Sequence, residues 1–340
     1  MWVYENEGYI YEEYIRRNRL YNKLYITHLY IYIYSSNIMS RVNFVKRNFT
    51  DGDDDAVLLE YLHNGHLAVI KLNRAKNRNS MTPDVLLGIN RCIQEVKANK
   101  DVRCVIITGK GSSFSAGADF KSKGITLATP AETSYGMYSH FLAVLDIEVP
   151  VRKILYSREP TVDILSNTSL IYIRYALQVI GALNGHAIGG GLGLALVCDI
   201  RVGNTKSKYG ANFVRLGLHP GMATTYIFPH LMGLPKALEM LLTGRIVEGE
   251  AAEKLGLLNH ACEGEDKVLE KAMEIAGEIV KNAPIATRWT KRSIYQLMRY
   301  DPKEAAWFEA LNQSHTGATK DNKEGIRALL QKRDPVFTGE

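Results

Sequence analysis

Two glycine-rich turns in this sequence present backbone N–H groups that could polarise a carbonyl group. The first is the Ala-Gly-Ala run in "SFSAGADFK", residues 113–121, and the second is the glycine triplet in "HAIGGGLG", residues 186–193. Glycine lets the backbone approach a ligand closely, and the second turn also begins a helix, where N–H groups point outward. Two such donors aimed at one carbonyl oxygen form an oxyanion hole, which lowers a reaction barrier by several kcal/mol.

A side chain that could move a proton is harder to find near these turns. No acid occurs from Asn184 to Cys198. His219, in "LGLHPGM", is chemically suitable because an imidazole changes its charge near neutral pH. Two interpretations of His219 stay open: a general base facing the same cavity as the turns, or a histidine that packs within its own loop. Tyr209 and Asn212 are further polar candidates.

The hydrophobic patterns around both turns predict the elements that position them. Residues 56–73 predict a β-hairpin across the "HNGH" turn, and residues 82–100 predict a helix that begins with Thr-Pro. Residues 102–119 predict a buried strand that runs into the first turn. Residues 179–203 predict a strand, the second turn, a helix and another strand.

The rest of the chain shows mainly helical periodicity. Residues 129–150 predict a helix, and residues 234–262 and 266–298 predict further helices with glycine or proline stops. Strands that alternate with helices, followed by helices alone, indicate an α/β core with a helical C-terminal part.

Composition excludes several classes of protein. The 340 residues are 46% hydrophobic and 23% charged, which is typical of a globular protein of one or two domains. The net charge of +6 is mild and comes without an Arg-rich stripe, so we expect no nucleic-acid partner. No apolar run reaches membrane-spanning length, and we expect no membrane association. The N-terminus lacks a secretory pattern and "VFTGE" is no peroxisomal signal, so we expect a soluble intracellular protein, cytoplasmic or mitochondrial.

The cysteines and paired histidines indicate neither disulfides nor a metal. The four cysteines are scattered without a C-x-x-C pair, which predicts free thiols in a reducing compartment: Cys92, Cys104, Cys198 and Cys262. His63 and His66 lie close together but lack a third ligand, so we interpret "HNGH" as a turn and expect no metal site.

Several motifs, taken together and in this order, resemble the crotonase superfamily, the enoyl-CoA hydratase/isomerase group. They are "LNRAKNRNSMT", "VIITGKGSSFSAGADFK", "VIGALNGHAIGGGLGLALVCDIRVG", "LGLHPGM", "ALEMLLTGRIVEGEAAEKLGLLNHA", "APIATRWTK" and "EGIRALLQKRDPVFTG". The resemblance implies an α/β fold, a crotonase-like spiral of ββα turns with two perpendicular sheets and a C-terminal helical trimerisation region. It also implies an acyl-CoA substrate, no cofactor beyond the CoA moiety, and a homotrimer or dimer of trimers.

The resemblance further implies roles for residues in the two turns. The N–H groups of Ala118 and Gly190 match the oxyanion-hole positions of the family. Positions that line the CoA adenine and phosphates in the family fall on Lys76, Arg78, Ala116, Asp119, Phe120 and Lys121. For Lys76 and Arg78 a solvated surface is the alternative.

The acids that the family uses for proton transfer are absent. The three positions where its members carry them hold Gly193, Phe213 and Gly221 here. Adding water across a C=C bond needs a base for the water and an acid for the α-carbon. Three interpretations stay open: a hydratase or isomerase in which His219 substitutes, a decarboxylase of malonyl-type CoA esters, and a non-catalytic acyl-CoA-binding homologue.

The same resemblance sets the expected domain boundaries. Residues 1–55 form an extension outside the family pattern, residues 56–260 the spiral core and residues 261–340 the helical C-terminal region. The extension is either disordered or an artefact of the gene model, with Met39 as a plausible start. Residues 151–178 interrupt the core. We interpret them as a retained intron, because Val codons begin with GT and a Gln codon can end in AG; a genuine insertion would loop out to the surface.

Overall fold

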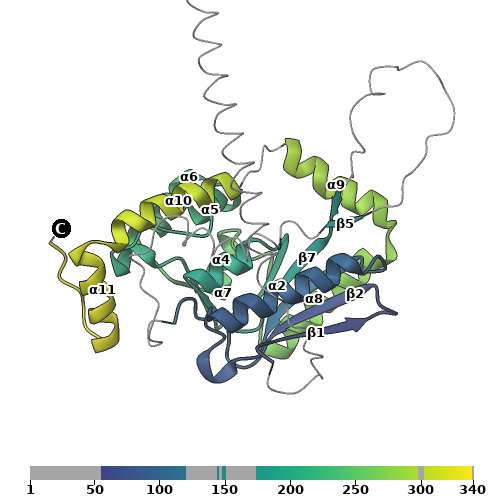
Figure 1. Ribbon diagram of the computed structural model, residues 1–340, viewed down its shortest axis with the longest axis horizontal. Coiled ribbons are helices and arrows are strands. Elements are labelled where there is room, and N and C mark those ends of the chain that lie inside the picture. The colour runs from purple at the N-terminus through teal and green to yellow at the C-terminus, as the bar shows by residue number, and fades with distance from the viewer. Residues whose placement is uncertain (1–54, 120–143, 145–147, 151–173, 298–301, 339–340) are drawn as a thin grey trace, which may run out of the picture. The chain divides into compact units, whose positions relative to one another are not determined.

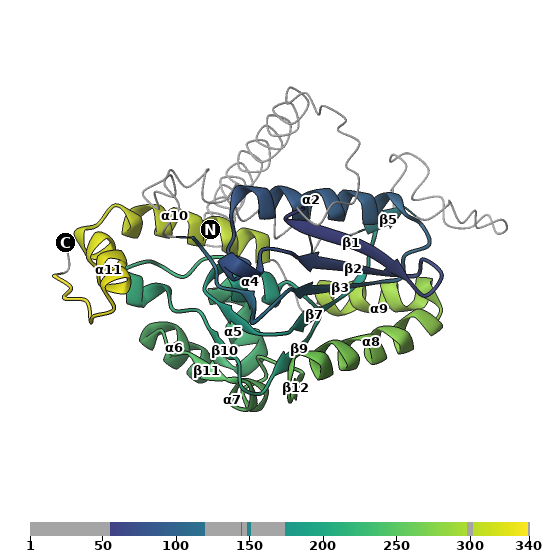
Figure 2. The same ribbon diagram turned by 90° about the horizontal axis from the view of Figure 1, so that it is seen from below.

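The described residues form two larger β-sheets and a separate two-stranded pair, with helices packed around them (Figures 1 and 2). The structure, a computed structural model, describes residues 55–119, 144, 148–150, 174–297 and 302–338. The predicted extension, except for Asp55, lies outside the described residues, as does most of the predicted insertion. Phe120 and Lys121 also lie outside them. The predicted core and C-terminal region belong to one compact unit, Asp54–Glu340.

The larger sheet has six strands in the order β1-β2-β3-β7-β9-β12. β1 and β2 form the predicted antiparallel hairpin, and every other neighbouring pair in this sheet is parallel. The bounds are β1 Val57–Leu62, β2 Leu67–Leu72, β3 Cys104–Gly109, β7 Gln178–Leu183, β9 Ile200–Asn204 and β12 His260–Cys262.

The smaller sheet has four strands in the order β11-β10-β8-β4. β4 and β10 pair with β8 in parallel, and β11 adds an antiparallel edge. Their bounds are β4 Ser113–Ser115, β8 His186–Ile188, β10 Lys208–Gly210 and β11 Val247–Glu248. A separate antiparallel pair joins β5 (Glu148–Pro150) to β6 (Arg174–Ala176).

Three strands of the larger sheet are each followed in the chain by a strand of the smaller sheet. β3, β7 and β9 each belong to the larger sheet, and the strands that follow them, β4, β8 and β10, belong to the smaller one. Each passage through both sheets is one turn of a spiral, and the parallel pairing stacks successive turns. The α/β fold with two sheets and C-terminal helices that the sequence predicts is therefore confirmed.

Helices cover both faces of the larger sheet. α2 and α8 lie on opposite sides of β1–β3 in Figure 2. Alternation along β2 explains this: Ala68 and Ile70 pack in the cluster that includes α2, whereas Leu67 and Val69 pack with α8. The helices are α2 Pro83–Ala98, α4 Gly190–Leu196, α5 Thr224–Met232, α6 Leu234–Thr243, α7 Gly249–Lys254, α8 Glu265–Lys281, α9 Pro284–Leu297, α10 Pro302–Gly317 and α11 Lys320–Gln331, with short 3₁₀ helices η1 Ala75–Asn77 and η2 Phe213–Leu216.

Most local predictions are confirmed, and one is wrong in part. Of the helix predicted over 129–150, only residue 144 and residues 148–150 are described, and the latter form strand β5, because Pro150 holds the preceding residue extended and Val149 favours a strand. The cysteines are free, and three of the four are buried. No helix among the described residues is long and apolar enough to span a bilayer.

Candidate active site

The two glycine turns lie directly against each other. The turn after β4 and the turn after β8 meet because these two strands are parallel neighbours. Gly117 has φ +81°, and a Cβ at this position would lie 2.7 Å from the carbonyl oxygen of Ile188 and 3.0 Å from the nitrogen of Gly190. Only glycine permits so close an approach. The structure therefore brings the predicted pair, Ala118 and Gly190, to one place.

Both predicted donors are unpaired within the described part of the chain. Gly190 is the first residue of α4, so its N–H has no partner within the helix. Among the described residues, neither the Ala118 nor the Gly190 N–H has a hydrogen-bond acceptor. Both residues are only half-buried. Two N–H groups are thus available to a ligand at the junction of the turns.

Two buried asparagines hold the loop that leads to the first turn. The amide nitrogen of Asn79 donates to the carbonyls of Lys110 and Ser113, at 3.1 and 2.8 Å. Asn184 accepts from the Gly109 N–H at 3.0 Å and donates to the carbonyl of Gly111. These side chains form hydrogen bonds with backbone groups of the loop that have no partner in a strand. The sequence reasoning missed both, although each stands within a glycine-rich or Asn-rich stretch that signals a turn.

Four of the six predicted CoA-binding residues are described, and they lie on two segments, residues 76–78 and 116–119. The Ala116 N–H donates to the carbonyl of Arg78 at 3.0 Å, and the Met81 N–H donates to that of Gly117 at 2.8 Å. These bonds place the loop that carries Lys76 and Arg78, both exposed, beside the first turn. Asp119 is half-buried at the end of the same turn.

The contacts of His219 are made with its own loop and with α10. Its Nδ1 lies 2.6 Å from the carbonyl oxygen of Pro220, so Nδ1 carries the proton and Nε2 is left as an acceptor. Its backbone N–H donates to Thr316, and its carbonyl accepts from Gln313. Burial lowers the pKa of the imidazole below its usual value. His219 is therefore neutral at pH 7.

Apolar atoms occupy two of the positions where an acid was sought. A Cβ at Gly193 would lie 2.6 Å from the Cβ of Met222 and 2.7 Å from its Sδ and Cε. The Met222 side chain therefore fills the space into which a side chain at 193 would project. Phe213 packs against the hydrophobic core, and Gly221 is buried.

Other polar residues near the turns have structural roles. The Tyr209 hydroxyl bonds both the N–H and the carbonyl of Asn204. His186 accepts from the Lys208 N–H at 2.9 Å and so joins β8 to β10. The described residues contain no group of three or more His, Cys, Asp or Glu side chains that could hold a metal ion.

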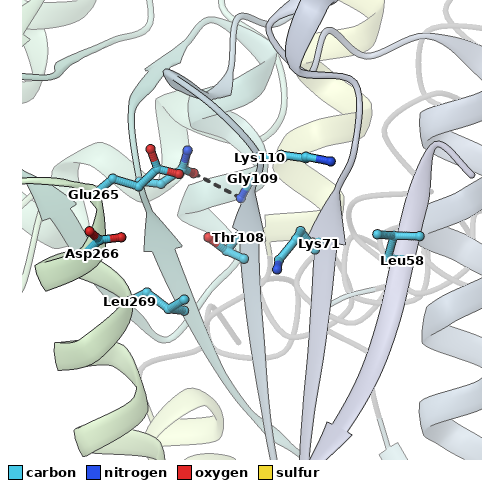
Figure 3. A pocket seen from close by; sticks show the side chains of 9 residues that line it. Leu58, Lys71, Thr108, Gly109, Lys110, Glu265, Asp266 and Leu269 are labelled. Atoms are coloured by element: carbon cyan, nitrogen blue, oxygen red, sulfur yellow. Dashed lines mark hydrogen bonds between the residues drawn. The ribbon is translucent and has the colours of Figure 1, made fainter. Parts of the chain in front are cut away.

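A separate cavity of about 220 Å³ lies on the α8 side of the larger sheet (Figure 3). Lys71 and Thr108 on the strands face Glu265 and Asp266 on α8 in this view, and Lys110 points away from these acids. Burial raises the pKa of Glu265. The residues of the two glycine turns do not line this cavity, so it is not part of the candidate site.

The chain matches a family model over most of its length. The model, described as enoyl-CoA hydratase/isomerase, aligns with residues 63–152 and 162–340. The chain belongs to this family. The unaligned residues 153–161 fall within the predicted insertion, and the aligned part includes both glycine turns of the candidate site.

Relatives with sequence similarity match most of the length of this chain. It is 33% identical to a putative enoyl-CoA hydratase/isomerase, YngF, of Bacillus subtilis, over 84% of this chain and 99% of that protein. It is 31% identical to the mitochondrial methylglutaconyl-CoA hydratase of Rattus norvegicus, over 82% of this chain and 81% of that protein. A solved enoyl-CoA hydratase from Bacillus anthracis is 28% identical over 84% of this chain and 100% of that chain, with a TM-score of 0.58.

A more distant neighbour supports the fold alone. The solved enoyl-CoA hydratase/isomerase of Pseudoalteromonas atlantica is 21% identical, covers 83% of this chain and has a TM-score of 0.65. The hydratase/isomerase family thus accounts for the fold and for the motifs around both turns.

Proposed function

We propose that this member of the enoyl-CoA hydratase/isomerase family is an acyl-CoA thioester enzyme that stabilises a thioester enolate. The proposal rests on one observation: Gly117 packs against Gly190, and the N–H groups of Ala118 and Gly190 are unpaired among the described residues. A thioester oxygen that accepts both hydrogen bonds gains negative charge as the enolate forms. Donors fixed in advance stabilise that charge more than they stabilise the neutral carbonyl.

The CoA part of the substrate would bind beside the first turn. Lys76 and Arg78 are exposed cations on the loop whose backbone bonds to Ala116. Guanidinium and ammonium groups suit phosphate oxygens, and their exposure leaves them accessible. No group beyond the CoA of the substrate is required by this chemistry.

The reaction at the acyl group has two candidates. A hydratase or isomerase needs a proton-transfer group, and His219 is the candidate for it: its ring is neutral at pH 7 and Nε2 can accept a proton. A decarboxylase of a malonyl-type ester needs no base. The bond to the carboxylate breaks, its electron pair forms the enolate, CO₂ leaves, and the α-carbon then takes a proton from water.

The apolar surroundings of Gly190 favour the decarboxylase as second candidate. Met222 fills the space at position 193, and Phe213 packs against the core. An apolar site destabilises a substrate carboxylate relative to neutral CO₂, which promotes its loss.

Substrate assays with the purified chain separate these functions. Titration calorimetry with butyryl-CoA and with free CoA tests thioester binding first. Hydration of crotonyl-CoA that His219→Ala abolishes supports the hydratase; release of CO₂ from malonyl-CoA, with no hydration, supports the decarboxylase. Thioester binding without either reaction supports the non-catalytic alternative. A butyryl-CoA affinity no higher than that of free CoA refutes the proposal.

The oligomeric state implied by the resemblance, a homotrimer or a dimer of trimers, stays a prediction. Light scattering coupled to size-exclusion chromatography of the same preparation measures it directly.

A further inference from the structure

Met222 covers the first turn of α4. Only 4% of the residue is exposed. Its Sδ lies 3.4 Å from the place that a Cβ on Gly190 would occupy, and 2.7 Å from the corresponding place on Gly193. The thioether therefore lies beside the residue whose N–H is the proposed donor to the thioester oxygen. The Met222 side chain also fills the space into which a side chain at position 193 would project.

The backbone of this loop adopts an uncommon conformation. Met222 has φ +63° and the next residue, Ala223, has φ +58°, both in the left-handed region. Residues with a Cβ rarely take this region, and two in succession persist only where the surroundings hold them. The strain places one particular side chain, that of Met222, over Gly190 and Gly193.

Glu309 of α10 holds this conformation. Its carboxylate accepts a hydrogen bond from the Ala223 N–H through one oxygen. The other oxygen accepts from the Thr225 N–H, at 2.8 Å, and from the Thr225 hydroxyl. The Glu309 side chain is fully buried. A helix of the C-terminal region thus fixes the loop that carries Met222.

We infer that Met222 is a specificity-determining residue whose thioether contacts the α-carbon of the bound acyl group and excludes branches there. The inference rests on the proposed function, because it takes the thioester oxygen to bind at the Ala118 and Gly190 N–H groups. The α-carbon is one bond from the carbonyl carbon, so it lies within van der Waals reach of atoms packed on Gly190. Met222 thereby takes the volume that a catalytic side chain at 193 would need.

Butyryl-CoA and isobutyryl-CoA test this inference, because the two esters are isomers that differ in branching at the α-carbon. We expect the wild type to bind butyryl-CoA at least about tenfold more tightly, the discrimination typical of one misplaced methyl group. Met222→Gly suits the left-handed backbone and empties the space, so the preference should fall to within about threefold. Met222→Leu fills the same space and should keep it.

The outcomes of this titration are distinct. An unchanged preference in Met222→Gly, or a wild type that binds both isomers equally, overturns the role of Met222 and leaves the proposed function standing. A wild type that binds neither ester more tightly than free CoA refutes the proposed function, and the role of Met222 with it.

A second pair of variants tests whether Met222 fills this space in solution. Gly193→Ala places a Cβ against Met222, so butyryl-CoA affinity should fall at least about tenfold. Met222→Gly in the same chain should restore most of that affinity. Gly277→Ala in α8 is the matched control, since a Cβ there meets no atom within 4 Å. If Gly193→Ala alone binds butyryl-CoA like the wild type, the space is not filled and the inference fails.

Discussion

The pH dependence of stability should reveal the buried carboxyl group of Glu309. Burial raises its pKa to about 7, against hydrogen bonds from Thr225 and Ala223 that lower it. The unfolded chain should protonate the same group near 4.5, its ordinary value. Between these two values the folded state binds one more proton than the unfolded state, so stability falls as pH rises. At about 1.4 kcal/mol per pH unit, the fall amounts to about 3 kcal/mol.

Glu309→Gln removes this titration while keeping the shape of the side chain. Its amide oxygen can still accept from Thr225, but its NH₂ group then meets the Ala223 N–H, donor against donor. A buried donor without a partner costs about 1–3 kcal/mol. We therefore expect the variant to be less stable than the wild type at pH 5, and the wild type to lose about 3 kcal/mol relative to the variant by pH 8, which cancels or reverses the difference.

Urea unfolding followed by circular dichroism at pH 5, 6, 7 and 8 measures this difference. Glu278→Gln, an exposed change on α8, serves as the control and should leave the wild-type pH profile intact. Burial lowers the pKa of His186 and of His219, which makes stability rise with pH, but both groups are present in every variant. Parallel profiles for the wild type and Glu309→Gln would refute the reasoning.

Two further predictions concern the turns and the packing of α9. Gly117→Ala places a Cβ 2.7 Å from the Ile188 carbonyl oxygen and 3.0 Å from the Gly190 nitrogen, so the turns must separate. Calorimetry of the folded variant should show at least about a tenfold loss of butyryl-CoA affinity. An unchanged affinity would show that Gly117 does not shape the proposed thioester site. Lys291→Met leaves Asp199, which Lys291 contacts at 2.7 Å and whose side chain is 16% exposed, without its cation. Urea unfolding should show a loss of about 3–5 kcal/mol, and a loss below about 1 kcal/mol would contradict this role of the pair.

Much of the fold was predictable because its signals are local. The "HNGH" turn between two alternating runs gave the β1–β2 hairpin, with His63, Asn64 and Gly65 all at positive φ. Asp199 has a structural role, since it accepts hydrogen bonds from Val179, Lys291 and Tyr295. The error at residues 148–150 arose because a short strand beside a helix-like pattern has too few residues to show its own period.

The site was predictable only where a motif marked it. The glycine turns stand out in the sequence, but the contact between Gly117 and Gly190 joins residues far apart in the chain and depends on the pairing of β4 with β8. The role of Met222 could not be predicted from the sequence, because tertiary packing sets the left-handed backbone at this methionine. Glu309 was missed because a glutamate in a C-terminal helix ordinarily faces solvent.

Packing constrains two of the three positions that lack the expected acid, 193 and 213. A side chain at 193 is incompatible with Met222 where it lies, and Met222 lies there because of the backbone at 222–223 and the carboxylate of Glu309. Phe213 contributes to the core instead of presenting a charge. Replacing Gly193 by an acid would therefore change packing before it changed chemistry. The N–H donors of Ala118 and Gly190 and the apolar side chains of Met222 and Phe213 are separate features. We propose that the donors bind the thioester oxygen and that the apolar side chains determine which reaction of the enolate occurs.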